Sequence, residues 1–173
     1  YGEACRYVLR VLKQFPDRFD PYLIHTNWGS CNWLFEDNDE RKWIDGLIQK
    51  TIQYQQQGGQ FDISVQVCIP NEFQQLAPIN ICYTAGIEST KISPEWFQGA
   101  LKYNKLILTS NHAKFGFENT TYPMIHKPTG QQFIAHVETP MEVISYPVKK
   151  YEPKSFDVQF EKDFNFLVVA QWS

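Results

Sequence analysis

The sequence predicts an α/β fold, in which a parallel β-sheet is covered by helices on both of its faces. Segments with helical spacing of apolar residues alternate with short β-prone segments from residue 1 to about residue 118. The apolar share of the 173 residues is 43%, as in a folded domain, and no apolar run approaches the length of a transmembrane helix. Alternating helices and strands of these lengths are typical of a parallel sheet.

Two helices and a short strand are predicted in the first third of the chain. Residues 2–15 carry apolar side chains at helical spacing and are followed by a proline, which ends the helix. A strand is expected at 20–24. The next helix is expected to begin at Asp37, with Glu40 completing a capping box, and to end at Gly58.

The middle of the chain continues the alternation. Residues 61–69 alternate apolar and polar side chains and predict a strand with unequal faces, although central parallel strands are usually apolar throughout. Further strands are expected at 79–83 and 106–108. Helices are expected to begin at Ser93, which precedes a proline, and at Ser110.

The last third of the chain has a different pattern. A turn at 127–130 and period-two apolar positions up to Val143 predict a β-hairpin or meander added to the edge of the sheet. Residues 146–162 are rich in Lys, Glu and Pro and predict a linker. Residues 164–170 form the most apolar strand of the sequence, and we expect them to be the first strand of another domain.

Composition and cysteine spacing exclude several classes of function. The net charge is −3 and the isoelectric point is about 5.8, so the surface as a whole does not suit nucleic acid. The four cysteines and four histidines lack the spacing of metal ligands, so we predict no metal site and no bound cofactor. Three of the cysteines fall in predicted helices or strands, and we therefore expect reduced thiols and a cytoplasmic protein.

Polar residues at predicted strand ends and at the first helix start are candidates for a site, because open α/β sheets bind ligands there. Asn71 and Glu72 can hydrogen-bond substrate hydroxyls, and Glu72 can take part in proton transfer. Alternatively, Asn71 is an ordinary turn residue. Glu88 is the first candidate for a catalytic carboxylate; alternatively it is a solvent-facing loop acid or a capping partner. Gly2 can offer helix N–H groups to a phosphate, or it is a frayed terminus.

Five further residues are candidates for substrate binding. Ser110 and Asn111 begin a predicted helix, where capping is the simpler role. The Lys114 ammonium can bind an anionic group of the substrate, or it can be exposed to solvent. Asn27 and Trp28 can form a platform on which a sugar stacks, although aromatic side chains more often belong to the core.

Five blocks of sequence resemble two-domain glycosyltransferases of the GT-B fold, close to family 4. They are residues 1–6 (YGEACR), 70–73 (PNEF), 84–90 (TAGIEST), 109–114 (TSNHAK) and 166–173 (FLVVAQWS). The similarity runs nearly from end to end, and the order and spacing of the blocks carry it.

The resemblance implies half of a GT-B architecture, which places two Rossmann-like domains on either side of a cleft. Residues 1–155 would be the amino-terminal, acceptor-side domain without its first strand. Residues 156–173 would be a linker and the first strand of the carboxy-terminal domain, which binds the nucleotide-sugar donor. The family transfers a sugar from that co-substrate to a saccharide or glycosylated acceptor. Because the donor-binding half has no counterpart here, we expect activity only when that half is supplied.

Two other functions remain open at this point. The chain can be a non-catalytic module with a Rossmann-like fold that binds a saccharide or a partner. It can also be a structural fragment without a retained function. An apolar terminal strand together with an uncovered face would in addition favour self-association.

Overall fold

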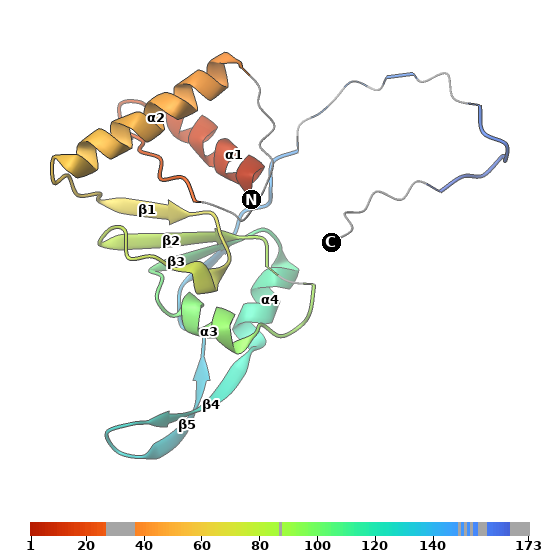
Figure 1. Ribbon diagram of the computed structural model, residues 1–173. Coiled ribbons are helices and arrows are strands. Elements are labelled where there is room, and N and C mark those ends of the chain that lie inside the picture. Colours follow the sequence, from red (N-terminus) through yellow and green to blue (C-terminus); the bar gives the residue numbers. More distant parts are fainter. Residues whose placement is uncertain are drawn as a thin grey trace.

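The computed structural model describes residues 1–26, 37–86, 88–148, 150, 152, 154–155 and 159–166. Its centre is a four-stranded parallel sheet flanked by helices (Figure 1), which confirms the predicted α/β class. The strands are β1 (Ile63–Gln66), β2 (Ile79–Thr84), β3 (Lys105–Leu108) and β6 (Met141–Val143). Helices α1 (Gly2–Lys13) and α2 (Asp39–Gln56) lie together beyond β1, and α3 (Pro94–Ala100) and α4 (Asn111–Asn119) lie on the opposite side of the strands.

The strands follow the order β1-β2-β3-β6, and each neighbouring pair is parallel. A short 3-10 turn, η1 (Pro70–Glu72), lies between β1 and β2, and α3 connects β2 to β3. Within the described part of the chain, β1 and β6 are the edge strands. Since all four strands are parallel, their carboxyl ends meet at one end of the sheet.

The first two helices form where the spacing of apolar residues predicts them, but the start of α2 differs from the prediction. Asn38, not Asp37, caps α2, because its side chain accepts a hydrogen bond from the Arg41 amide at 2.9 Å. Glu40 then falls one position short of a capping box and turns toward α1 instead. Gly58, with φ of +78°, ends the helix as predicted.

The predicted strand at 20–24 is an extended segment that is not part of either sheet in the described structure. The expected hairpin forms, but it is a separate antiparallel sheet of β4 (Thr121–His126) and β5 (Gln131–His136) rather than an addition to the edge of the parallel sheet. Met141–Val143 leaves that hairpin and joins β3 as the parallel strand β6. Backbone hydrogen bonds from Leu106 to Pro140 and from Ile144 to Leu108 hold both ends of β6 there.

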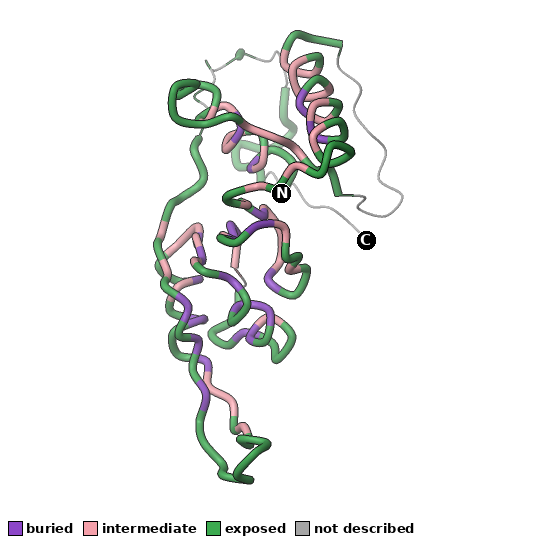
Figure 2. The backbone as a smooth tube through the Cα atoms, turned by 90° about the vertical axis from the view of Figure 1, so that its left-hand side faces the viewer, coloured by how far each residue is buried: buried purple, intermediate pink, exposed green. Residues whose placement is uncertain are grey.

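The apolar core lies between the sheet and the helices α3 and α4. Phe97, Leu106 and Phe117 are fully buried in it. Buried residues gather on this side of the molecule in Figure 2, whereas α1 and α2 are mostly half-buried or exposed. Since fully burying a large apolar side chain contributes about 1.5–3 kcal/mol, the α3–α4 face stabilises the fold more than the α1–α2 face does.

β1 turns polar side chains toward the core, and this explains the polar alternation in its sequence. Asn80 Oδ1 accepts hydrogen bonds from Ser64 Oγ at 2.7 Å and from Gln66 Nε2 at 3.3 Å. The Tyr103 hydroxyl donates to Gln66 Oε1 at 3.2 Å. Every buried side-chain nitrogen or oxygen of the described residues has a hydrogen-bond partner, so this network carries no desolvation penalty from an unpaired group.

The carboxy-terminal prediction lies largely beyond the described structure. The strand expected at 164–170 includes Phe164 and Phe166, which are exposed, and continues into residues that are not described. None of the described helices is long and apolar enough to cross a membrane.

Gly99 is the glycine whose replacement is expected to disturb the packing of α3 most. A Cβ atom there would lie 2.2 Å from the carbonyl oxygen of Pro70, so Gly99→Ala must push α3 away from η1. We expect the free energy of unfolding to fall by about 1–3 kcal/mol in urea denaturation.

Gly46→Ala is the matched control, because the new Cβ in the exposed middle of α2 meets nothing within 4 Å. Higher helix propensity should stabilise this variant by up to about 1 kcal/mol. Equal effects of the two substitutions would contradict the described contact between α3 and η1.

Candidate functional site

The outer edge of β1 has no neighbouring strand in the described structure. β1 pairs with β2 through Ile63–Gln66, and its other edge faces a cavity. Ile63 is 53% exposed and Val65 is 40% exposed, although both are apolar and belong to a strand of the sheet. An open edge with exposed β-branched residues is unusual, since it invites pairing with another strand.

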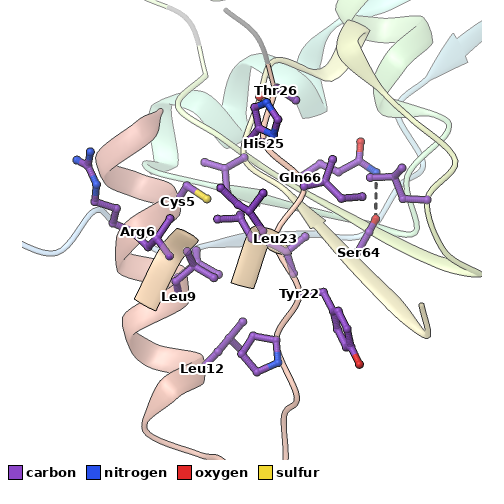
Figure 3. A pocket seen from close by; sticks show the side chains of 18 of the residues that line it. Cys5, Arg6, Leu9, Leu12, Tyr22, Leu23, His25, Thr26, Ser64 and Gln66 are labelled. Carbon is purple, nitrogen blue, oxygen red and sulfur yellow. Dashed lines mark hydrogen bonds between the residues drawn. The ribbon is translucent and has the colours of Figure 1, made fainter. Parts of the chain in front are cut away.

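An extended segment, residues 20–26, lines the cavity together with β1. Tyr22 fixes the beginning of this segment, because its ring packs against Tyr54 at 4.7 Å and Phe61 at 5.4 Å between centroids. The Leu23 amide donates to the Thr51 hydroxyl of α2 at 2.8 Å. In Figure 3, the segment runs from Tyr22 to His25 in the same direction as β1 runs from Ser64 to Gln66.

The cavity that these segments line, here called the edge cavity, has a volume of about 2120 Å³. Its walls come from α1, α2, residues 18–26, β1 and the chain around η1. Its α1 and α2 lining combines apolar residues, such as Leu9 and Ile48, with charged ones, such as Glu40 and Asp45. Cys5 also lines it, and burial raises the pKa of that thiol (Figure 3). Pockets for small molecules measure roughly 300–1,000 Å³, so the edge cavity is too large for a snug small ligand.

The first turn of α1 lies at the carboxyl ends of the strands. The Tyr1 hydroxyl is 3.2 Å from Thr84 Oγ1, at the last residue of β2. Next to it, the rings of Tyr83 and Tyr146 lie 5.5 Å apart, and the Tyr83 hydroxyl donates to the Ile144 carbonyl at 3.3 Å. Burial, followed by the neighbouring tyrosines, raises the pKa of Tyr146. The start of a helix and several phenolic hydroxyls thus converge at the sheet end where α/β proteins bind ligands.

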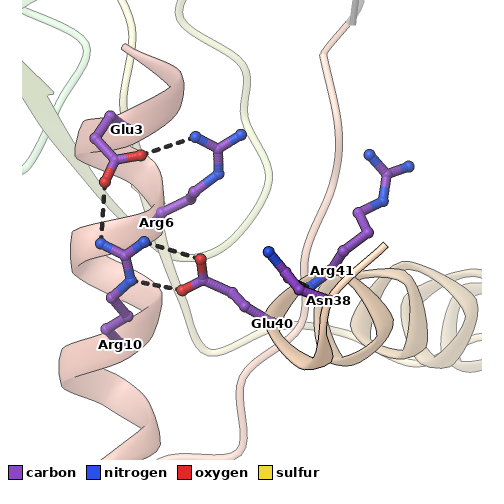
Figure 4. A network of polar contacts seen from close by, with 6 residues as sticks. All are labelled: Glu3, Arg6, Arg10, Asn38, Glu40 and Arg41. Carbon is purple, nitrogen blue, oxygen red and sulfur yellow. Dashed lines mark hydrogen bonds and ion pairs between the residues drawn. The ribbon is translucent and has the colours of Figure 1, made fainter. Parts of the chain in front are cut away.

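An ion-pair network joins α1 to α2 beside the edge cavity (Figure 4). Arg10 donates to both carboxylate oxygens of Glu40, at 2.5 and 2.8 Å, and to Glu3 at 3.0 Å. Glu3 also accepts from Arg6 at 2.8 Å. Hydrogen bonds from Arg10 lower the pKa of Glu40, and those from Arg6 and Arg10 lower the pKa of Glu3. This network ties the wall formed by α1 to the wall formed by α2.

A second, smaller cavity of about 710 Å³ lies on the other side of the sheet, and we call it the aromatic cavity. It is lined by Trp96 of α3, Tyr122 of β4 and the loop that contains Glu88 and Lys91. The Lys91 ammonium lies 4.5 Å from the centre of the Tyr122 ring, and the Tyr122 hydroxyl donates to the Ile92 carbonyl at 2.7 Å. Its volume is in the range of small-molecule pockets.

The structure divides the residues proposed from the sequence between these two places. Gly2, Asn71 and Glu72 line the edge cavity. Glu88 lines the aromatic cavity, so the two candidate catalytic carboxylates do not share a cavity. The closeness of this loop to α4 explains the separation. A Cβ atom at Gly86 would lie 2.4 Å from that of Ala113, and a Cβ atom at Gly116 would lie 3.7 Å from the Ser89 carbonyl oxygen, so the loop follows α4.

The remaining candidates have structural partners or lie outside the described residues. Ser110 caps α4 by accepting from the Ala113 amide at 3.0 Å, the capping role considered from the sequence. Asn111 is the exposed first residue of α4, and Lys114 pairs with Glu118 at 3.5 Å. Asn27 and Trp28 lie outside the described residues. The described residues contain no group of three or more His, Cys, Asp or Glu side chains able to hold a metal ion.

Sequence reasoning missed the tyrosines at the carboxyl ends of the strands. Tyr83 belongs to a predicted strand and Tyr146 to a predicted linker, so spacing alone does not bring them together. Only the positions of these residues in the sequence could have indicated the cluster, because Tyr1 precedes the first predicted helix and Tyr83 ends a predicted strand. The chain matches no protein-family model, no curated protein and no solved structure.

Glu40→Gln tests the ion pair that joins the two helices. The Arg10 and Glu40 side chains are 36% and 33% exposed, so the pair is expected to contribute about 0.5–1 kcal/mol at pH 7. Because the folded pKa of Glu40 lies below its ordinary value of 4.5, this contribution is present above that pH and is lost as the pH falls through the folded pKa.

Urea denaturation of the wild type and Glu40→Gln at pH 7 and near pH 3 measures this difference. The two proteins should differ at pH 7 and converge in acid. Glu138→Gln, which removes an exposed carboxylate far from Arg10, is the control and should leave the difference near zero at both pH values. A gap that persists unchanged in acid would show that Glu40 stabilises the fold without its charge.

Proposed function

We propose that this chain is the acceptor-side domain of a GT-B glycosyltransferase, which transfers a sugar from a nucleotide-sugar donor to a saccharide or glycosylated acceptor. The carboxy-terminal donor-binding domain would complete the enzyme. The parallel sheet flanked by helices is compatible with one Rossmann-like half of that architecture. The five sequence blocks motivate the choice of glycosyltransferase among the many activities that such folds carry.

The observation that carries the proposal is the place of the α1 amino terminus. Tyr1 lies against Thr84 at the carboxyl ends of the strands, so the first turn of a 12-residue helix points to the ligand-binding end of the sheet. Helix N-terminal amides, including that of Gly2, suit the diphosphate of a nucleotide-sugar. Glu3 lies in the same turn, but its charge is balanced by ion pairs with Arg6 and Arg10.

Glu72 and Asn71 are the residues that we propose for the acceptor. Both are exposed and line the edge cavity, which Gly2 also lines. Asn71 would hydrogen-bond an acceptor hydroxyl. Glu72 would take the proton of the attacking acceptor hydroxyl. The oxygen of that hydroxyl would bond to the anomeric carbon of the donor sugar, and the nucleoside diphosphate would leave with the electrons of the broken bond. Glu88 lines the aromatic cavity instead and has no part in this proposed transfer.

One observation favours the second candidate function, a non-catalytic module that binds saccharides. Glu88 lies with Trp96 and Tyr122 in a cavity of small-molecule size and does not share a cavity with Glu72. Aromatic side chains with a few polar groups are the usual lining of a ligand pocket. A binding module would therefore use the aromatic cavity, and its affinity would not depend on Glu72.

Glu72→Gln separates the two functions when it is measured in the polypeptide that also supplies the donor-binding half. The enzyme proposal expects kcat/KM for sugar transfer to fall by about 10²–10⁴-fold, because the general base is lost. Glu138→Gln, an exposed carboxylate that lines neither cavity, should retain the wild-type rate. Absence of nucleotide-sugar turnover and hydrolysis in the wild type, together with saccharide binding unchanged in Glu72→Gln, would favour the binding module instead.

A further inference from the structure

We propose that Cys68 and Cys82 form a redox-sensitive pair, in which a peroxide oxidises the Cys68 thiol to a sulfenic acid and the Cys82 thiol then closes a disulfide with it. Both cysteines are free thiols in the described structure. The inference does not depend on sugar transfer, because it rests on the contacts and the burial of these two side chains.

The register of the first two strands brings the two cysteines together. β1 ends at Gln66, which lies opposite Cys82 of β2, and Cys68 follows two residues later. A two-residue step along an extended chain returns to the same side of the sheet. The side chains of Cys68 and Cys82 are hydrogen-bonded to each other, and the Cys82 thiol also donates to the Cys68 carbonyl at 3.7 Å. The two sulfur atoms are therefore neighbours.

The two cysteines differ in access, and this difference assigns them different roles. Cys68 is half-buried and lines the edge cavity, so a small oxidant can approach it from there. Cys82 is fully buried and belongs to the apolar core. An accessible thiol beside a second thiol is the usual arrangement of a redox sensor and its resolving cysteine. Cys68 is therefore the residue that reacts with the peroxide, and Cys82 is the one that closes the disulfide.

Hydrogen bonds to Cys68 favour its thiolate, which is the form that reacts with peroxides. The Tyr103 hydroxyl lies 3.6 Å from Cys68 Sγ. Hydrogen bonds with Cys82 and Tyr103 lower the pKa of Cys68, although burial and the Glu72 carboxylate act against them. The same contact with Cys68, followed by burial, raises the pKa of Cys82. The cluster therefore activates only one of its two thiols.

Hydrogen peroxide is the only oxidant that the reaction of the pair requires. The Cys68 thiolate attacks one oxygen of the peroxide, and the O–O bond breaks with release of hydroxide. The sulfur of Cys82 then bonds to the sulfur of Cys68, and the sulfenic hydroxyl leaves with the proton of the Cys82 thiol as water. Each disulfide thus consumes one peroxide, and the protein loses two hydrogen atoms.

Peptide mapping of the folded chain, after treatment with one equivalent of hydrogen peroxide at pH 7, tests the pair. Trypsin cuts after Lys50 and Lys91, so the peptide 51–91 contains both cysteines and no other. We expect this peptide to lack two hydrogen atoms and to resist alkylation until it is reduced. A second cut after Glu72 should leave its two halves joined. A disulfide that links two chains, or one formed with any other cysteine in place of this pair, would overturn the proposal.

Single substitutions test the two roles. Cys82→Ala should abolish the disulfide and leave a sulfenic acid at Cys68, which dimedone labels. Cys68→Ala should abolish both products. Cys5→Ser is the matched control, because Cys5 lines the same cavity but burial raises the pKa of its thiol, so the disulfide in peptide 51–91 should form as in the wild type. A folded Cys82→Ala variant without labelling at Cys68 would overturn the proposal.

Two further measurements show whether the fold creates this reactivity. In the folded chain, Cys68 should react with peroxide about tenfold or more faster than Cys5, and the difference should vanish in urea. Tyr103→Phe keeps the ring, which packs against Phe73 at 4.8 Å between centroids, but removes the hydroxyl beside Cys68. The rate at pH 7 should then fall by about threefold or more, and the pH profile of the reaction should shift upward. A preference for Cys68 that persists in urea, or an unchanged pH profile in Tyr103→Phe, would overturn the proposal.

Discussion

Paired backbone N–H and C=O groups hold the centre of this structure together, and every other element takes its place from that ladder. The ladder runs from β1 through β2 and β3 to β6, with Cys82 opposite Leu106 and Leu108 opposite Val143. Because all four strands are parallel, each connection must return along the sheet, and α3 and α4 lie in the connections from β2 to β3 and from β3 to β6. The same requirement for pairing makes the outer edge of β1 the conspicuous feature of the described structure, since its ladder stops there beside a large cavity with both apolar and charged lining residues.

The two halves of the structure differ in how well they are packed. On the α3–α4 face, Phe97, Leu106 and Phe117 are fully buried. On the other face, α1 and α2 are linked by the ion pair between Arg10 and Glu40 and line a large cavity. Partly exposed ion pairs contribute little free energy, so apolar contacts must supply most of the stability of this half.

The sequence was sufficient for those elements whose signals are local. Ser93 and Ser110 cap helices where their position predicts it, and Gly58 ends α2 because only its backbone adopts a positive φ without strain. Non-local pairing was harder to predict. Strands β5 and β6 both carry apolar residues at alternate positions, and this alternation does not indicate which neighbouring strand each will pair with. Likewise, Glu72 and Glu88 both follow strands, but the loop after Gly86 takes Glu88 to another cavity.

The proposed acceptor site depends on the carboxyl end of the sheet beside Tyr1, where Gly2, Asn71 and Glu72 line one cavity. The most direct measurement is the change in backbone amide chemical shifts when a saccharide is titrated into the chain. The account predicts changes at Asn71 and Glu72, beside the start of α1. Changes confined to Glu88, Trp96 and Tyr122, which line the aromatic cavity, would contradict the account.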